Sequence, residues 1–240
     1  MMFRAYRFAG VVSHVINVGK SNVRFISFLK MKETFKHLIG MDSDKLPYEH
    51  VCQIGDPVLR GRAMTIDPEV IKLADFQKVI KQLISVMQHY GACGMSAPQI
   101  GLPWQMFAIE YTKGHMDTTD EVVRKVHEME IIPTTVFINP ELKIIDHTPI
   151  MFYEGCESIR GYAAAVPRAY EIEITALNTF AEQFTWKARG WSARIAQHEY
   201  DHLQGQLFID KMDKCTFHCS AWEKINKNNG NMQLSYYPKK

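Results

Sequence analysis

The chain contains Gln197-His198-Glu199-Tyr200-Asp201-His202, an H-E-x-x-H pattern that we expect at the centre of the fold. Four residues advance an α-helix by about 400°, so the imidazoles of His198 and His202 lie about 40° apart on one face and roughly 6 Å apart along the axis. One metal ion can then contact both rings, while Glu199 lies beside them as a base. Because a catalytic metal site usually takes three protein ligands, the third ligand decides the function.

The flanking residues predict that this pattern lies on a helix. Ser192 is a suitable N-cap and Gly205 a suitable stop, and Ile195 falls on the same side as the two histidines. Both histidines could instead be ordinary side chains of an amphipathic helix, so the motif alone does not establish a metal site.

Two residues compete for the place of the third ligand. Glu223 follows the motif as the glutamate of a thermolysin-like protease would, although its segment also fits a final surface helix. Cys156 lies upstream in Glu154-Gly155-Cys156-Glu157-Ser158, and a thiolate is a strong metal ligand. A lone cysteine after a strand can also be a small buried apolar residue. A metzincin would need a histidine where Phe208 stands, so that class is excluded.

A third segment, Gly94-Met95-Ser96-Ala97-Pro98-Gln99, precedes the other two motifs. In this order the three motifs resemble those of peptide deformylases, G-φ-[AS]-A-P-Q with φ apolar, E-G-C-x-S and Q-H-E-x-D-H. The resemblance extends from about Cys52 to Lys214, and Glu157 together with Gly190-Trp191 looks most like the mitochondrial branch. The departures from the bacterial pattern, at Ala92, Ala196 and Tyr200, remove no metal ligand and no base.

The resemblance implies a function and a set of roles. Cys156, His198 and His202 would bind one divalent metal, Glu199 would accept and deliver a proton, and Gln99 with the backbone N–H of Glu157 would stabilise the oxyanion. The substrate would be a peptide that begins with N-formylmethionine, laid beside Cys93, Gly94 and Gly155. We expect Fe²⁺ as the native metal, with Zn²⁺ or Co²⁺ able to replace it.

Position alone suggests supporting charges around the motifs. Glu154 and Asp201 adjoin the candidate ligands, where each could accept an N–H or pair with Arg168. Solvent-facing charges at loop and helix edges would explain these residues equally well.

The patterning predicts an α+β fold, and the resemblance implies mixed or antiparallel β-sheets around the H-E-x-x-H helix. A helix is expected from Asp67-Pro68 to about Tyr90. Residues 112 to 132 form a charged insertion that we expect on the surface, with a short helix. Strands are expected at Met106 to Tyr111, Thr135 to Asn139, Leu142 to Asp146, Tyr170 to Leu177 and Phe184 to Ala188.

The composition fits one domain behind a leader. The 240 residues are 46% hydrophobic, enough for one substantial core, and no run is long enough to cross a membrane. We expect a leader over residues 1–45, a catalytic domain over 46–225 and a mobile tail over 226–240.

Charge separates the leader from the rest of the chain. Residues 1 to 40 carry seven Lys or Arg against one acid, a composition typical of a transit peptide, although a basic amphipathic surface helix shares it. That segment has a formal charge of +6, and because the whole chain carries +2 the remaining 200 residues carry −4. The acidic body argues against nucleic acid as a partner. Five cysteines, an odd number, indicate a reducing compartment, and we expect the mitochondrial matrix.

Three functions are thus compared. The leading one is the removal of formyl groups from nascent chains, with N-formylmethionyl peptides and transiently the ribosome as partners. A zinc endopeptidase using His198, His202 and Glu223 is the enzymatic alternative. A metal-holding protein that binds peptides without turnover is the alternative from another class.

Overall fold

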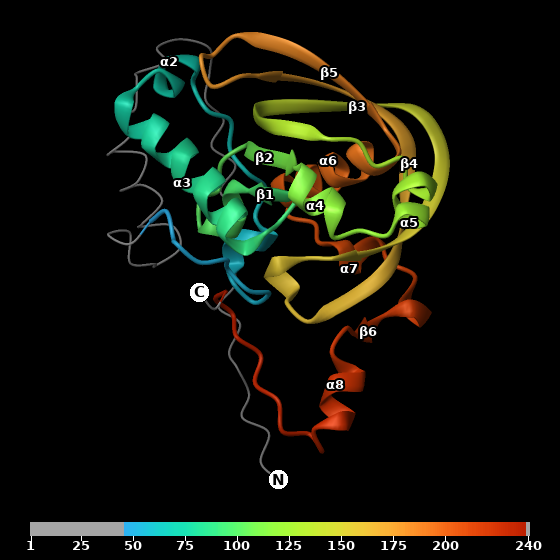
Figure 1. Ribbon diagram of the computed structural model, residues 1–240. Coiled ribbons are helices and arrows are strands. Elements are labelled where there is room, and N and C mark those ends of the chain that lie inside the picture. Colours follow the sequence, from blue (N-terminus) through green and yellow to red (C-terminus); the bar gives the residue numbers. More distant parts are fainter. Residues whose placement is uncertain (1–45, 239–240) are drawn as a thin grey trace.

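The structure is a computed structural model that describes residues 46–238. Its framework is a six-stranded antiparallel sheet in the order β1-β2-β3-β4-β5, with β6 paired to β4 (Figure 1). The α+β prediction, with antiparallel sheet around the H-E-x-x-H helix, is confirmed. The strands are β1 (Gly94–Ser96), β2 (Met106–Tyr111), β3 (Ile132–Gly155), β4 (Tyr162–Leu177), β5 (Gln183–Arg189) and β6 (His218–Cys219).

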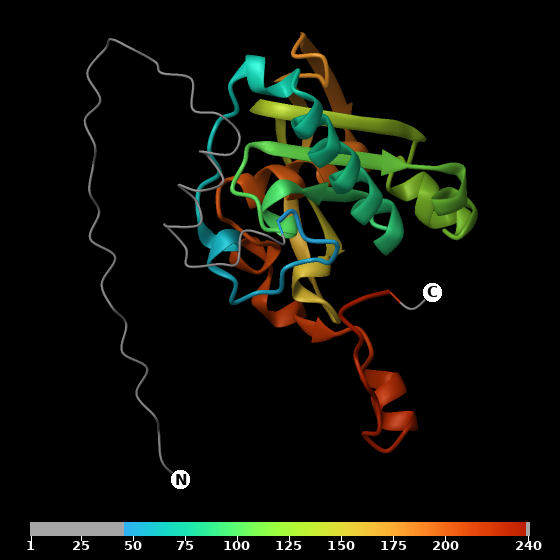
Figure 2. The same cartoon turned by 90° about the vertical axis from the view of Figure 1, so that its left-hand side faces the viewer.

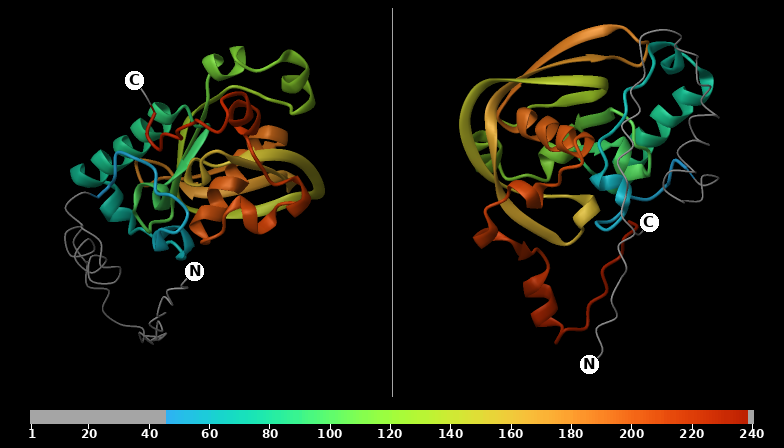
Figure 3. Two further views of the ribbon diagram at one scale, coloured as in Figure 1. Left: turned by 90° about the horizontal axis from the view of Figure 1, so that it is seen from below. Right: turned by 180° about the vertical axis from the view of Figure 1, so that it is seen from behind.

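Helix α6 (Gly190–Leu203) carries the H-E-x-x-H motif and lies inside the curve of the long strands β3 and β4, as Figures 1 and 3 show. The other described α-helices are shorter, apart from α3. They are α2 (Pro68–Ile71), α3 (Ala74–Tyr90), α4 (Lys113–Asp117), α5 (Glu121–Val126), α7 (Phe208–Lys211) and α8 (Trp222–Lys227). Short 3₁₀ turns η2 (Pro57–Arg60), η3 (Ala97–Ile100), η4 (Glu157–Ile159) and η5 (Lys214–Thr216) join them.

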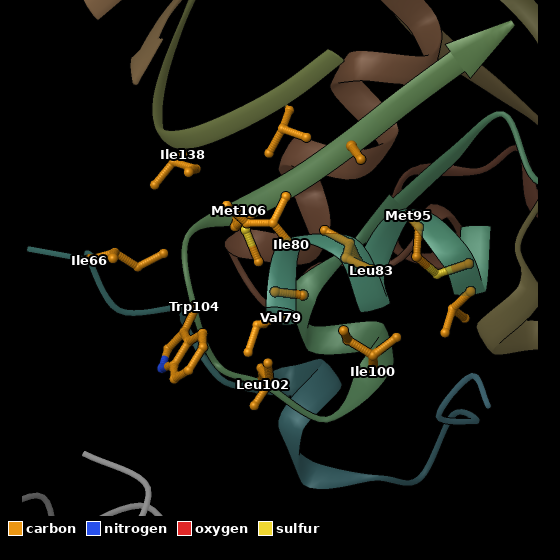
Figure 4. Packing of buried hydrophobic residues seen from close by; sticks show 14 of the residues in the cluster. Ile66, Val79, Ile80, Leu83, Met95, Ile100, Leu102, Trp104, Met106 and Ile138 are labelled. Atoms are coloured by element: carbon orange, nitrogen blue, oxygen red, sulfur yellow. The ribbon is translucent and has the colours of Figure 1, made fainter. Parts of the chain in front are cut away.

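Two apolar clusters pack around the sheet and position the helix that carries the motif. Helix α3 packs against β1 and β2, where its side chains meet those of the two strands and of the loop between η3 and β2 (Figures 2 and 4). On the other side, Ala193, Ala196 and Leu203 of α6 pack against the sheet beside Phe107 and Phe137. Burial of these apolar faces fixes the position of α6 relative to β1.

Helix α6 follows β5 without a loop, so the expected start at Ser192 is wrong. Arg189 is extended, Gly190 turns the chain at φ +56°, and the helix begins there. The N–H of Trp191 donates to the carbonyl of His127 at 3.0 Å, so the insertion satisfies part of the helix N-terminus in place of a Ser192 cap. At the other end, Gly205 adopts φ +71°, close to the predicted stop.

The helix expected from Asp67 to Tyr90 is two helices. Asp67 caps α2, but Leu73 is extended at ψ 138° and starts a second helix, α3, which ends at Gly91 as expected. The strands expected at Thr135 to Asn139 and Leu142 to Asp146 are one strand, β3, whose register shifts between Ile138 and Glu141 without ending the pairing with β4. The strand expected at Tyr170 belongs to β4, which starts earlier, at Tyr162.

The remaining segments agree with the patterning where the structure describes them. The charged insertion holds the short helices α4 and α5, in which no residue is buried. Among residues 46–238, no helix has the length and apolar character needed to cross a membrane. The expected leader lies outside the described residues.

Candidate metal centre

Three side chains from two distant parts of the chain meet at α6. Cys156 follows the last residue of β3, and His198 and His202 come from consecutive turns of α6. Their ligand atoms all lie within 4.8 Å of one another, and the Cys156 Sγ is 3.4 Å from His202 Nε2. The two rings are 5.1 Å apart and cross at 77°, so both can present a nitrogen to one point. A thiolate and two imidazoles are the donor set of a catalytic divalent ion, so these residues fit a metal.

The carboxylate of Glu154 fixes one of the ligand rings. Glu154 is buried, and although burial favours its neutral form, its hydrogen bonds to Arg168 and His198 hold its pKa well below its usual range. An ionised carboxylate can only accept, so the Nδ1 of His198, 2.9 Å from Glu154 Oε2, carries a proton. The Nε2 of His198 is then free for an ion.

Two arginines balance the charge of Glu154. Arg168 donates to both Glu154 oxygens at 2.9 and 2.8 Å and also to Asp201, and Arg194 donates to Glu154 at 2.7 Å. All four side chains are buried. Losing one partner of a buried pair costs about 3–5 kcal/mol, whereas an exposed pair such as Lys72 with Glu69 contributes up to about 1 kcal/mol. Loss of one member of this network would therefore cost more than loss of a surface ion pair.

Glu199 is placed for proton transfer. It is 4% exposed, and burial raises its pKa to about 7, so its protonated and ionised forms are both populated near neutral pH. Its Oε2 has no hydrogen-bond partner among the described residues. A Cβ added at Gly94 would lie 2.6 Å from Glu199 Oε1, so only glycine lets β1 approach this carboxyl.

Gln99 is held with its amide N–H₂ towards Cys156. The Ser96 N–H and hydroxyl donate to Gln99 Oε1 at 2.9 and 3.0 Å. Gln99 Nε2 therefore donates, to Ser158 Oγ at 3.2 Å and to Cys156 Sγ at 3.6 Å. This donor is fixed before any substrate arrives.

A cleft of about 380 Å³ opens beside these residues. Ala92, Cys93 and Gly94 line one wall, and residues 153–157 line the other. Trp191, Ile195, His198 and Glu199 of α6 lie at its base. Burial raises the pKa of Cys93 to about 11, so that residue is a neutral thiol at pH 7.

The structure brings most of the predicted site residues together. The side chain of Glu157 turns towards Arg160, with an ion pair of 2.8 Å, which leaves its backbone beside the cleft. Glu223 does not join the cluster, because it lies exposed on α8 and does not line the cleft. Arg194 was missed in the sequence, where nothing marks it apart from other arginines of a helix.

Comparisons with known proteins agree with this geometry. Residues 48–218 match the family described as polypeptide deformylase. The human mitochondrial peptide deformylase is 44% identical over 180 residues, which are 75% of this chain and 74% of that protein. Peptide deformylase 1A of Arabidopsis thaliana, chloroplastic and mitochondrial, is 34% identical over 85% of this chain and 77% of its own. The crystal structure of the enzyme from Thermotoga maritima has a TM-score of 0.55 and 29% identity, over 68% of this chain and 96% of that one.

Two cysteines in one cleft offer a matched test of the metal centre. Cys156→Ala removes a ligand, so we expect cobalt(II) to bind at least tenfold more weakly and without the absorption band of a cobalt–thiolate bond. Cys93→Ala in the same cleft is expected to keep both the affinity and the band. Titration of each metal-free variant with cobalt(II), followed by absorption spectroscopy, measures the affinity and the band. A band that persists in Cys156→Ala would place the sulfur ligand elsewhere.

Proposed function

Because the chain belongs to the peptide deformylase family, which removes the N-formyl group from nascent peptides, we propose that it performs this hydrolysis with one divalent metal held by Cys156, His198 and His202. The observation that carries the proposal is the meeting of these three ligand atoms beside the buried carboxyl of Glu199. When bound, the ion supplies Lewis-acid polarisation and makes hydroxide available near neutral pH.

Glu199 moves the proton in both halves of the reaction. As water adds to the formyl carbon, Glu199 accepts one proton, and it delivers that proton to the amine nitrogen when the C–N bond breaks. Formate and a free amino terminus leave. A pKa of about 7 suits a group that must accept and donate at neutral pH, because neither form is strongly disfavoured.

Gln99 and the Glu157 backbone N–H would receive the developing negative charge. The Gln99 amide is already oriented by Ser96, so it need not reorganise as the charge appears on the formyl oxygen. The N–H of Glu157 follows Cys156 directly, and Glu157 lines the cleft, so this N–H would be the second donor.

The substrate would enter as an extended chain between two strand edges. Within the described residues, β1 pairs only with β2, and the end of β3 pairs only with β4, so each keeps one open edge. Gly94 and Gly155 lie at these edges and line the cleft. A peptide laid there can use main-chain hydrogen bonds, which read no sequence beyond the first residue.

Glu154, Arg168 and Asp201 would act as positioning residues. Glu154 orients His198, Arg168 joins Glu154 to Asp201, and Asp201 also accepts from Lys211. They keep the ligand helix in register with the cysteine loop.

Replacement of Glu199 tests the assignment. In Glu199→Gln the ligands remain but the proton carrier is lost, so we expect normal metal content and a fall in formate release from a formyl-methionyl peptide of at least about 100-fold. Glu223→Gln serves as the matched control and is expected to lose neither metal nor activity, because Glu223 is exposed on α8.

The same pair of variants separates the alternatives. Loss of metal in Glu223→Gln, together with cleavage of internal peptide bonds by the unaltered chain, would support the endopeptidase. Undiminished formate release in Glu199→Gln would remove its catalytic role, and tight peptide binding without formate release by the unaltered chain would support the binding protein.

We propose ferrous iron as the native metal. The Cys-His-His set accommodates several divalent ions, and affinity alone favours zinc over iron.

A thiolate beside ferrous iron is prone to oxidation. We therefore expect the iron-loaded enzyme to lose most of its activity on exposure to air, and the zinc-loaded enzyme to change little. Activity measured anaerobically and in air, with metal analysis of each sample, decides this. If the iron-loaded and zinc-loaded enzymes are equally stable in air and the zinc form is the more active, the iron assignment is contradicted.

We also propose that residues 1–45 direct the protein to the mitochondrial matrix, ahead of a catalytic domain at 46–225 and a C-terminal tail at 226–240. The basic composition of residues 1–40 and the organellar locations named for the relatives support this proposal. Nascent chains and ribosomes of such an organelle would be the partners of the enzyme. Isolated mitochondria should import and shorten the full chain but not a chain lacking residues 1–45. Equal import of both would reject the leader.

A further inference from the structure

The residues after the family match form an addition beside the cleft. The match ends at residue 218, and the chain continues through Cys219, the helix α8 and an irregular segment up to residue 238. Figures 1 and 3 show α8 projecting from the body and the last segment returning towards it. Residues outside the family match therefore come back to the region of the site.

The returning segment contacts one residue that lines the cleft and others close to it in the chain. A Cβ at Gly161, on the turn that follows the Cys156 loop, would lie 3.1 Å from Leu234. At the end of α3, two residues before Ala92 of the cleft, the Tyr90 hydroxyl donates to the carbonyl of Tyr236 at 2.9 Å. The ring of Tyr237 lies 5.0 Å from His89 and 6.0 Å from Tyr90. The tail is thus anchored at Gly161, which lines the cleft, and at the end of α3, next to the residues that lead into β1.

An apolar pocket of about 210 Å³ lies under this segment. Cys219, Ile225, Met232 and Leu234 line it, and it shares Gly161 and Tyr162 with the catalytic cleft. An engineered apolar cavity of about 150 Å³ holds a benzene ring, so this pocket can hold a large aliphatic side chain.

We propose that this pocket is a subsite for an apolar side chain of the formylated peptide, located downstream of the formylmethionine. The inference rests on the proposed function. Because Gly161 and Tyr162 line both the pocket and the cleft, the two lie side by side, and a peptide that leaves the metal centre in that direction would pass the pocket. Side chains of an extended chain point alternately to either side, so one of them can enter while the backbone stays on the strand edges. The tail would then give a preference that main-chain pairing alone cannot.

The test compares tetrapeptides on the metal-loaded full chain. Formyl-Met-Ala-Leu-Ala and formyl-Met-Ala-Ala-Leu are compared with the same peptides carrying Ser in place of Leu. At one of the two positions we expect kcat/KM to be about tenfold higher for Leu, mainly through KM, as an apolar pocket provides. A Leu-to-Ser ratio near one at both positions would overturn the subsite. Absence of formate from all four peptides would instead refute the proposed function.

Two variants and one control connect the preference to the pocket. Ala221→Phe fills the pocket, and Leu234→Ser makes its wall polar. In both variants the Leu-to-Ser ratio of kcat/KM should therefore fall towards one. Phe180→Ser, an exposed apolar residue at 73% in the turn between β4 and β5, should keep the ratio of the unaltered chain. Thermal unfolding checks each variant, and Ala221→Phe carries the test if Leu234→Ser does not fold. If the preference for Leu persists in Ala221→Phe, the Leu side chain binds elsewhere and the proposal is overturned.

Discussion

The buried carboxylate of Glu154 is the contact on which the arrangement of the site depends. It lies near the end of β3, directly before Gly155 and Cys156, and it is bound by Arg168 of β4 and by Arg194 and His198 of α6. One side chain therefore sets the position of the cysteine loop, the tautomer of a ligand ring and the rotation of the helix. Because two guanidinium groups compensate its charge, the group stays ionised although it is shielded from water.

The same layout explains why two neighbouring acids have opposite chemistry. Glu154 is surrounded by donors and is held ionised, whereas Glu199 is buried without such partners and has a pKa of about 7. The close approach of Gly94 shields Glu199 on the β1 side and keeps the carboxyl beside the ligand rings. Environment, and not residue type, thus divides a positioning role from a proton-transfer role.

Local patterns predicted the parts of the protein that depend on local rules. The spacing of His198 and His202 and the motif around Cys156 identified the candidate ligands, and the expectation that Arg168 pairs with Glu154 and Asp201 agrees with the contacts. Long-range packing decided what the sequence did not reveal. Asn139 looked like a strand end, but its side chain bonds the backbone of Ile66 and the strand continues past it. The contribution of Arg194 and the return of the tail to Tyr90 likewise arise from residues far apart in the chain.

The distance in sequence between Cys156 and His202 also bears on how the protein matures. In the folded chain the thiol lies beside the rings because β3, β4 and β5 pair and α6 packs inside their curve. A chain still in extended form, whether leaving a ribosome or crossing a membrane, has no preformed pocket to retain an ion. All three ligands can therefore hold an ion only where this part of the chain is folded, so the ion is drawn from the supply of the compartment in which folding is completed.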